Sequence, residues 1–101
     1  MVRPFAELQL DDVLTDLPAV TLEEGLRERG QIRAGATTLR LLCSDAFRDL
    51  VVYTPAHRQA FCIEPYTCVT DAVNLQADGI DAGWQVLQPG VCWSAIVELR
   101  V

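Results

Sequence analysis

The sequence has a single histidine, His57, so it cannot support a metal or catalytic site that needs several histidines. Its four cysteines, Cys43, Cys62, Cys68 and Cys92, fit no common zinc spacing. Free, buried thiols in a reducing compartment are expected, with a disulfide as the alternative. A phosphate-binding glycine loop and a Gly-x-Ser-x-Gly nucleophile motif are also lacking. The sequence therefore predicts neither a metal site nor a serine-hydrolase triad.

Basic residues are scarce as well. Eight Lys and Arg residues against 14 Asp and Glu residues give a net charge of −6. Because an acidic chain repels phosphate backbones and anionic lipids, nucleic acid and membrane surfaces are not expected partners. No segment is long and apolar enough to span a bilayer, and residues 1–5 lack the apolar core of a signal peptide. These features predict a cytoplasmic location.

Half of the residues are hydrophobic, and the length predicts one domain over residues 1–101. Alternating or β-branched runs predict strands over residues 5–10, 37–43, 50–54, 59–64, 82–87 and 92–101, with Pro65 ending the fourth. Strands joined by short turns indicate an all-β fold, an antiparallel β-sandwich or part of one.

Two segments have helical signals. Thr21 and Glu24 form a capping box that predicts a helical turn through Arg29, although an irregular excursion between strands fits equally well. Residues 70–75 predict one helical turn capped by Thr70 or Asp71.

Three carboxylates are candidates for chemistry. Glu64 ends an apolar strand, where a charge costs desolvation energy unless the site uses it, for example as a general base. A solvent-facing glutamate at a strand end is the alternative. Asp11 and Asp12 are adjacent, so one would line a cleft while the other faces water, or both belong to a polar turn. His57 is expected in a solvated turn, and the tryptophans Trp84 and Trp93 in the core rather than stacked on a ligand.

The stretch from Tyr53 to Cys68 contains Phe61-Cys62-Ile63-Glu64-Pro65-Tyr66-Thr67 and resembles the catalytic-base strand of the aldose 1-epimerases, or galactose mutarotases. The similarity continues through residues 71–75 and 87–90, and residues 10–17 look like the aspartate-containing strand of that family. The resemblance implies a galactose mutarotase-like supersandwich, of which this chain is the C-terminal portion. It also implies interconversion of α and β anomers of a hexose without a cofactor.

On this resemblance, Glu64 matches the catalytic base and Asp11 the sugar-binding aspartate, with Asp12 the alternative if the register slips by one. The family's catalytic histidines lie N-terminal to anything present here, and His57 matches neither. The resemblance thus predicts an isomerase portion that is weak or inactive alone, pairing with itself or with a missing N-terminal half. The alternative is a non-catalytic carbohydrate-binding or oligomerising β-sandwich module.

Overall fold

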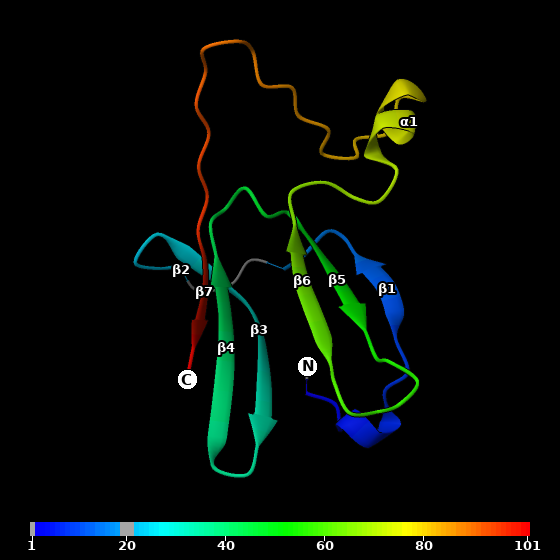
Figure 1. Ribbon diagram of the computed structural model, residues 1–101, viewed down its shortest axis with the longest axis vertical. Helices are drawn as coiled ribbons and strands as arrows, with labels where there is room; N and C mark the ends of the chain where they lie inside the picture. The colour runs from blue at the N-terminus through cyan, green and yellow to red at the C-terminus, as the bar shows by residue number, and fades with distance from the viewer. Residues whose placement is uncertain (1, 19–21) are drawn as a thin grey trace.

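The computed structural model describes residues 2–18 and 22–101, and within them the fold is almost entirely β (Figure 1). A 3-10 helix, η1, spans Phe5–Glu7, and a short helix, α1, spans Ala72–Ala77. The strands are β1 (Asp11–Leu14), β2 (Leu22–Glu23), β3 (Leu26–Ala34), β4 (Thr37–Cys43), β5 (Asp49–Tyr53), β6 (Cys62–Tyr66) and β7 (Val97–Arg100). The prediction of an all-β fold is confirmed.

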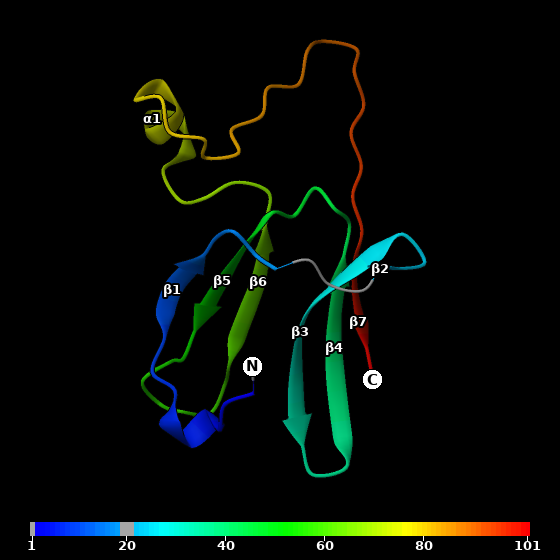
Figure 2. The same cartoon turned by 180° about the vertical axis from the view of Figure 1, so that it is seen from behind.

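The described strands form two antiparallel sheets. The first sheet has the order β1-β5-β6, and the second has the order β2-β3-β4-β7. Figures 1 and 2 show the two sheets next to each other, with α1 and a long irregular segment beyond one end of both. The strands predicted over residues 37–43 and 50–54 correspond to β4 and β5.

A small apolar core joins the two sheets. Leu41 of β4 and the β5 residues Leu50 and Val52 are buried together. Ile63 of β6 packs against them and comes so close to Gly30 of β3 that a Cβ atom at Gly30 would clash with its side chain. The two sheets therefore pack as an antiparallel sandwich.

The second sheet is strongly curled. Glu23 and Arg100 lie on its two outer strands, β2 and β7, and nevertheless form an ion pair. Arg40 of β4 bridges the sheet, with 2.7 Å from its guanidinium to both Glu23 and Glu28. The register of β3 against β4 shifts between Glu28 and Gly30, and such a bulge increases local twist and bending.

The strand predicted over residues 5–10 is wrong, since η1 occupies residues 5–7 and β1 begins only at Asp11. A tertiary contact explains the difference. The Arg58 guanidinium donates hydrogen bonds to the carbonyls of Leu8 (2.7 Å) and Phe5 (2.8 Å) and stacks on the Phe5 ring at 4.5 Å. These contacts favour a compact turn over an extended strand.

The helical turn predicted through Arg29 is also wrong, because β2 and β3 form a hairpin there. Its two turn residues, Glu24 and Gly25, have φ of 54° and 79°, which is typical of the tight turns that join antiparallel strands. Thr21, the predicted cap, lies outside the described residues.

Pro65 does not end its strand, as β6 runs from Cys62 to Tyr66 and residues 59–61 are not part of it. β6 is an edge strand, and an edge position accommodates a proline, which has no N–H to donate. The predicted helical turn exists as α1, shifted to residues 72–77. Asp71 precedes it in a left-handed conformation without a side-chain cap.

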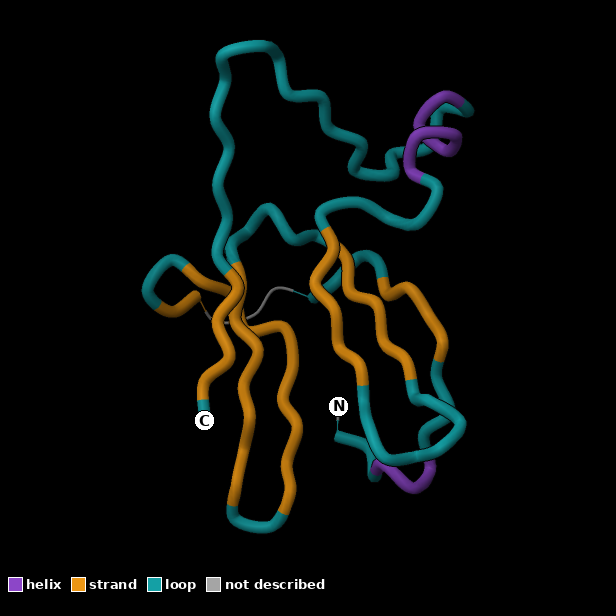
Figure 3. Tube along the Cα trace, viewed as in Figure 1, coloured by secondary structure: helices purple, strands orange, loops and turns teal. Residues whose placement is uncertain are grey.

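The C-terminal region is less regular than predicted. Residues 82–87 form no strand, and of the strand expected over residues 92–101 only Val97–Arg100 is present (Figure 3). Trp84 and Trp93, expected in the core, are about half exposed (48% and 51%). The four cysteines are free as predicted, but of the four only Cys43 is buried, while Cys62 and Cys68 are half-buried and Cys92 is exposed. In the described part of the chain, no helix has the length and apolarity to cross a membrane.

Candidate functional site

The first sheet brings Asp11 and Glu64 to one face. In the register, Asp11 of β1 lies opposite Tyr53 of β5, and Val51 of β5 lies opposite Glu64 of β6. Tyr53 and Val51 are two positions apart and share a face, because side chains alternate along a strand. We call this surface the carboxylate face, made up of Asp11, Val13, Val51, Tyr53, Glu64 and Tyr66.

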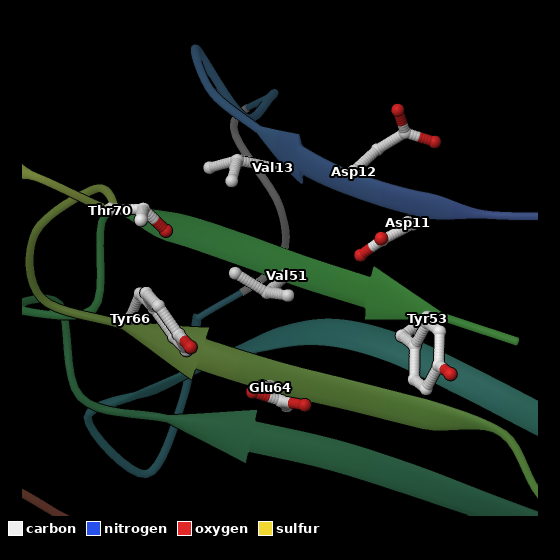
Figure 4. A pocket seen from close by; sticks show the side chains of 8 residues that line it. All are labelled: Asp11, Asp12, Val13, Val51, Tyr53, Glu64, Tyr66 and Thr70. Atoms are coloured by element: carbon white, nitrogen blue, oxygen red, sulfur yellow. The ribbon is translucent and has the colours of Figure 1, made fainter. Parts of the chain in front are cut away.

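The carboxylate face borders an open hollow of about 410 Å³. Figure 4 shows the side chains of Glu64, Tyr66, Val51 and Tyr53 along two neighbouring strands, with Asp11 next to Tyr53. Glu64 and Tyr66 are half-buried and Asp11 is exposed. The complete lining is Asp11, Asp12, Val13, Val51, Tyr53, Glu64, Tyr66 and Thr70.

Asp12 borders the same hollow from a different direction. It lies opposite Val52, a core residue, so the strand alternation assigns it to the other face of β1. In Figure 4 its carboxylate points away from Asp11 and Glu64. Of the two adjacent aspartates, Asp11 is therefore the one that shares a face with Glu64.

Tyr66 supplies a hydroxyl next to Glu64. The negative charge of Glu64 is the largest cause that raises the pKa of the Tyr66 phenol, and desolvation adds to it. The phenol thus remains protonated at neutral pH and keeps an O–H to donate. Tyr66 and Tyr53 are not among the site residues predicted from the sequence. The spacing of two between Glu64 and Tyr66 was a usable signal for the first, whereas the second depends on the pairing of β5 with β6.

The chemistry of this lining suits a neutral ligand rich in hydroxyl groups. Carboxylates accept hydrogen bonds from hydroxyls, and the partly exposed ring of Tyr53 (40%) offers an apolar surface for ring C–H groups. Within the described residues, the lining contains no Lys, Arg or His. An anionic ligand would therefore meet repulsion without compensation.

The single histidine lies elsewhere. His57 is exposed in the loop between β5 and β6, where its Nδ1 accepts a hydrogen bond from the backbone N–H of Gln59 (2.9 Å), and it does not line the hollow. No group of three or more His, Cys, Asp or Glu side chains in residues 2–18 and 22–101 is arranged to hold a metal.

A buried carboxylate lies at the start of β5. Asp49 is opposite Tyr66 in the register and only 1% exposed, with neither side-chain oxygen hydrogen-bonded within the described residues. Burial raises the pKa of Asp49, and the nearby Arg48, whose Nε is 3.2 Å from one oxygen, offsets part of that effect. By strand alternation Asp49 is on the same side of the sheet as Val51 and Tyr66, but it does not line the hollow.

Comparison with known proteins does not assign the chain to a family. No protein-family model matches the chain, and no solved structure gives a significant match to it. The resemblance to the aldose 1-epimerases stays a prediction from the residues that carry it.

Proposed function

We propose that the carboxylate face is a hexose-binding site of the aldose 1-epimerase type, with Glu64 as the base and Asp11 as the acceptor for sugar hydroxyls. One observation supports this proposal above the others. Two carboxylates that are far apart in the sequence lie on the same face of one sheet and border the same hollow. The resemblance to the aldose 1-epimerases implies sugar-contacting roles for Glu64 and for Asp11, with Asp12 as the alternative.

In the proposed reaction Glu64 removes the proton from the C1 hydroxyl of the hexose. The C1–O5 bond breaks as O5 takes up a proton, and rotation about C1–C2 followed by reclosure gives the other anomer. No cofactor takes part. Asp11 would hold the sugar by accepting hydrogen bonds from its hydroxyls, and the ring of Tyr53 would lie against its C–H groups.

Among the described residues, none at the hollow is a good donor of the proton for O5. His57 is away from the hollow, and the raised pKa of Tyr66 makes its phenol a weak acid. General acid–base assistance typically contributes about 10²–10⁴-fold per group. We therefore expect this chain to bind a hexose but to catalyse its mutarotation weakly or not at all. The cytoplasmic location predicted from the sequence is part of this proposal.

Binding and turnover are tested separately. Isothermal titration with D-galactose and D-glucose should give saturable binding, and polarimetry of freshly dissolved α-D-glucose should give no rate above buffer. Glu64→Gln and Asp11→Asn should each weaken binding about 10-fold or more, because each removes a hydrogen bond to a charged group. Glu7→Gln, an exposed change in η1, is the control and should bind like the unmodified chain.

Two results would contradict the proposal. The hexose site is wrong if Glu64→Gln and Asp11→Asn bind as tightly as Glu7→Gln, or if neither sugar binds. A clear mutarotation rate that vanishes in Glu64→Gln would support the base but refute the missing acid, and would give that role to His57 or to water. Stronger weakening by Asp12→Asn than by Asp11→Asn would move the sugar contact to the other aspartate.

A further inference from the structure

The last residues of the chain form a part of the second sheet that the rest of the described protein covers only partly. β7 is the outer strand of that sheet, hydrogen-bonded to β4 along one edge. Residues 91–96 precede it as an extended segment without assigned secondary structure. We call residues 91–101 the C-terminal arm. Figures 1 and 3 show its first half running beyond the ends of the neighbouring strands.

The apolar side chains of β7 lie on the core face of the sheet but are not covered. Leu99 pairs with Leu41 and Val97 pairs with Cys43, so each pair shares a face. Leu41 and Cys43 are buried (4% and 0% exposed), whereas Leu99 and Val97 are 64% and 48% exposed. The apolar surface that forms the core therefore continues onto β7 without a partner among the described residues.

The backbone of the arm is also free to pair. The N–H of Ser44 donates to the carbonyl of Ile96 (2.9 Å), which makes Ser44 and Ile96 a hydrogen-bonded pair. Because such pairs alternate in an antiparallel ladder, the N–H and C=O groups of Val97 and Leu99 point away from β4. Residues 92–95 make no backbone hydrogen bond to the rest of the described chain.

The exposed area is large enough for a stable interface. The chain exposes 7219 Å², against about 5,700 Å² for a compact monomer of its 11.2 kDa mass. Its radius of gyration is 15.4 Å, against about 12.7 Å for a compact domain of this length. The excess over the whole chain is about 1,500 Å², which is more than the roughly 800 Å² that each partner buries in a standard protein interface.

We propose that a second copy of this chain binds along the free edge of β7, antiparallel, with the two-fold axis at Val97. This register pairs residues 93–101 of both copies and aligns their outward backbone groups. It places Trp93 opposite Val101 of the partner subunit and Ala95 opposite Leu99 of the partner subunit, so apolar residues meet on one face. The two second sheets then form one continuous sheet.

The charges of the arm are compatible with this register and with a second copy as the occupant. Arg100 falls opposite Ser94 of the partner subunit and Glu98 opposite Ile96 of the partner subunit, so no like charges face each other. An axis at Glu98 would place two carboxylates directly opposite, which is destabilising. A two-fold interface uses the same surface on both subunits, and the alternating pattern of the arm, apolar at odd positions from 91 to 101, is complementary to itself.

Light scattering after size exclusion, with a reductant to keep Cys92 free, tests the proposal. Unmodified chain at about 100 μM should have twice the 11.2 kDa chain mass. Leu99→Lys should raise the dimer dissociation constant at least about 10-fold, since charge on an edge strand opposes pairing. Val73→Lys changes an exposed apolar residue of α1 (50%, against 64% for Leu99) and should leave the dimer unchanged.

Hydrogen exchange tests the same interface without a substitution, in case Leu99→Lys fails to fold. The amides of Val97 and Leu99 should become more protected as the concentration of the unmodified chain rises, while those of α1 stay the same. A monomer at about 100 μM would overturn the proposal. So would a dimer that Leu99→Lys leaves intact, or association without added protection at Val97 and Leu99.

Discussion

Two glycines with nearly the same positive φ angle test how the loop next to the site is held. Gly83 and Gly90 have φ of +82° and +81°, but their surroundings differ. A Cβ atom at Gly83 would lie 2.7 Å from the carbonyl oxygen of Thr67 and 3.1 Å from the Cα of Cys68, both of which are backbone atoms. A Cβ atom at Gly90 would meet nothing within 4 Å.

The two alanine substitutions should therefore differ in cost. The left-handed conformation costs an L-residue about 1–2 kcal/mol, and both variants incur it. Gly83→Ala adds the overpacking penalty, about 1–3 kcal/mol. We expect Gly90→Ala to lower the free energy of unfolding by about 1–2 kcal/mol and Gly83→Ala by about 2–5 kcal/mol. Urea unfolding followed by circular dichroism measures both, and unchanged m-values would indicate that the compared states are the same.

The difference between the variants reports on the segment that leads to the hollow. The N–H of Val69 donates to the carbonyl of Ala82 (3.0 Å), and Thr70 of the hollow lies one position further along. Equal costs for Gly83→Ala and Gly90→Ala would refute the packing of residues 67–70 against residues 82 and 83. The reasoning would also fail if Gly90→Ala were the more costly change.

Three further substitutions have defined outcomes in unfolding experiments. Burial raises the pKa of Asp49. The contribution of Asp49 to stability is therefore present below the unfolded pKa of about 3.9 and is lost as the pH rises through the pKa of the folded state. Compared with the unmodified chain, Asp49→Asn should become more stable between about pH 4 and pH 7, and the absence of this gain would contradict the reasoning. The hydrogen bond from Arg40 lowers the pKa of Glu28. The contribution of Glu28 to stability is therefore present above the unfolded pKa of about 4.3 and is lost as the pH falls through the pKa of the folded state. Glu28→Gln should make the loss of stability on acidification smaller. Thr54 is 6% exposed and its hydroxyl accepts the N–H of Leu10 at 2.8 Å, so Thr54→Val should cost about 1–2 kcal/mol, and an unchanged urea midpoint would argue against that bond.

The sequence predicted the strands in which the local run of side chains itself favours an extended conformation. β4 and β5 carry runs of Leu, Val and Thr that fit a pleated, half-buried surface, and both were predictable. The hairpin with its turn at Glu24 and Gly25 was not predictable. Glu24 also completes a capping-box pattern, which favours a helix, whereas the structure has positive φ angles at both turn residues. The strand expected over residues 5–10 fails for a different reason. Arg58, which is 50 positions from Leu8 and 53 from Phe5 in the chain, holds that segment as a turn.

In the candidate site, too, some features follow from the local sequence and others from contacts between distant strands. The sequence indicated Glu64 as a candidate base and predicted that one of Asp11 and Asp12 lines a cleft while the other faces water; in the structure all three border the hollow. It left open which aspartate shares a face with Glu64, because this depends on the pairing of β1 with β5 and of β5 with β6. A shift of one residue in either register would exchange Asp11 for Asp12. Long-range register of this kind is absent from any local pattern.

Observation of the carboxylate carbons tests the central claim most directly. In a chain labelled with ¹³C, the side-chain carboxyl signals of Glu64 and Asp11 are followed while D-galactose is added, with Glu98 of β7 as the internal reference. Both signals should shift along one saturable curve with a common dissociation constant, while Glu98 stays constant. If the Glu64 and Asp11 signals do not move, or move no more than that of Glu98, the carboxylate face does not bind the hexose.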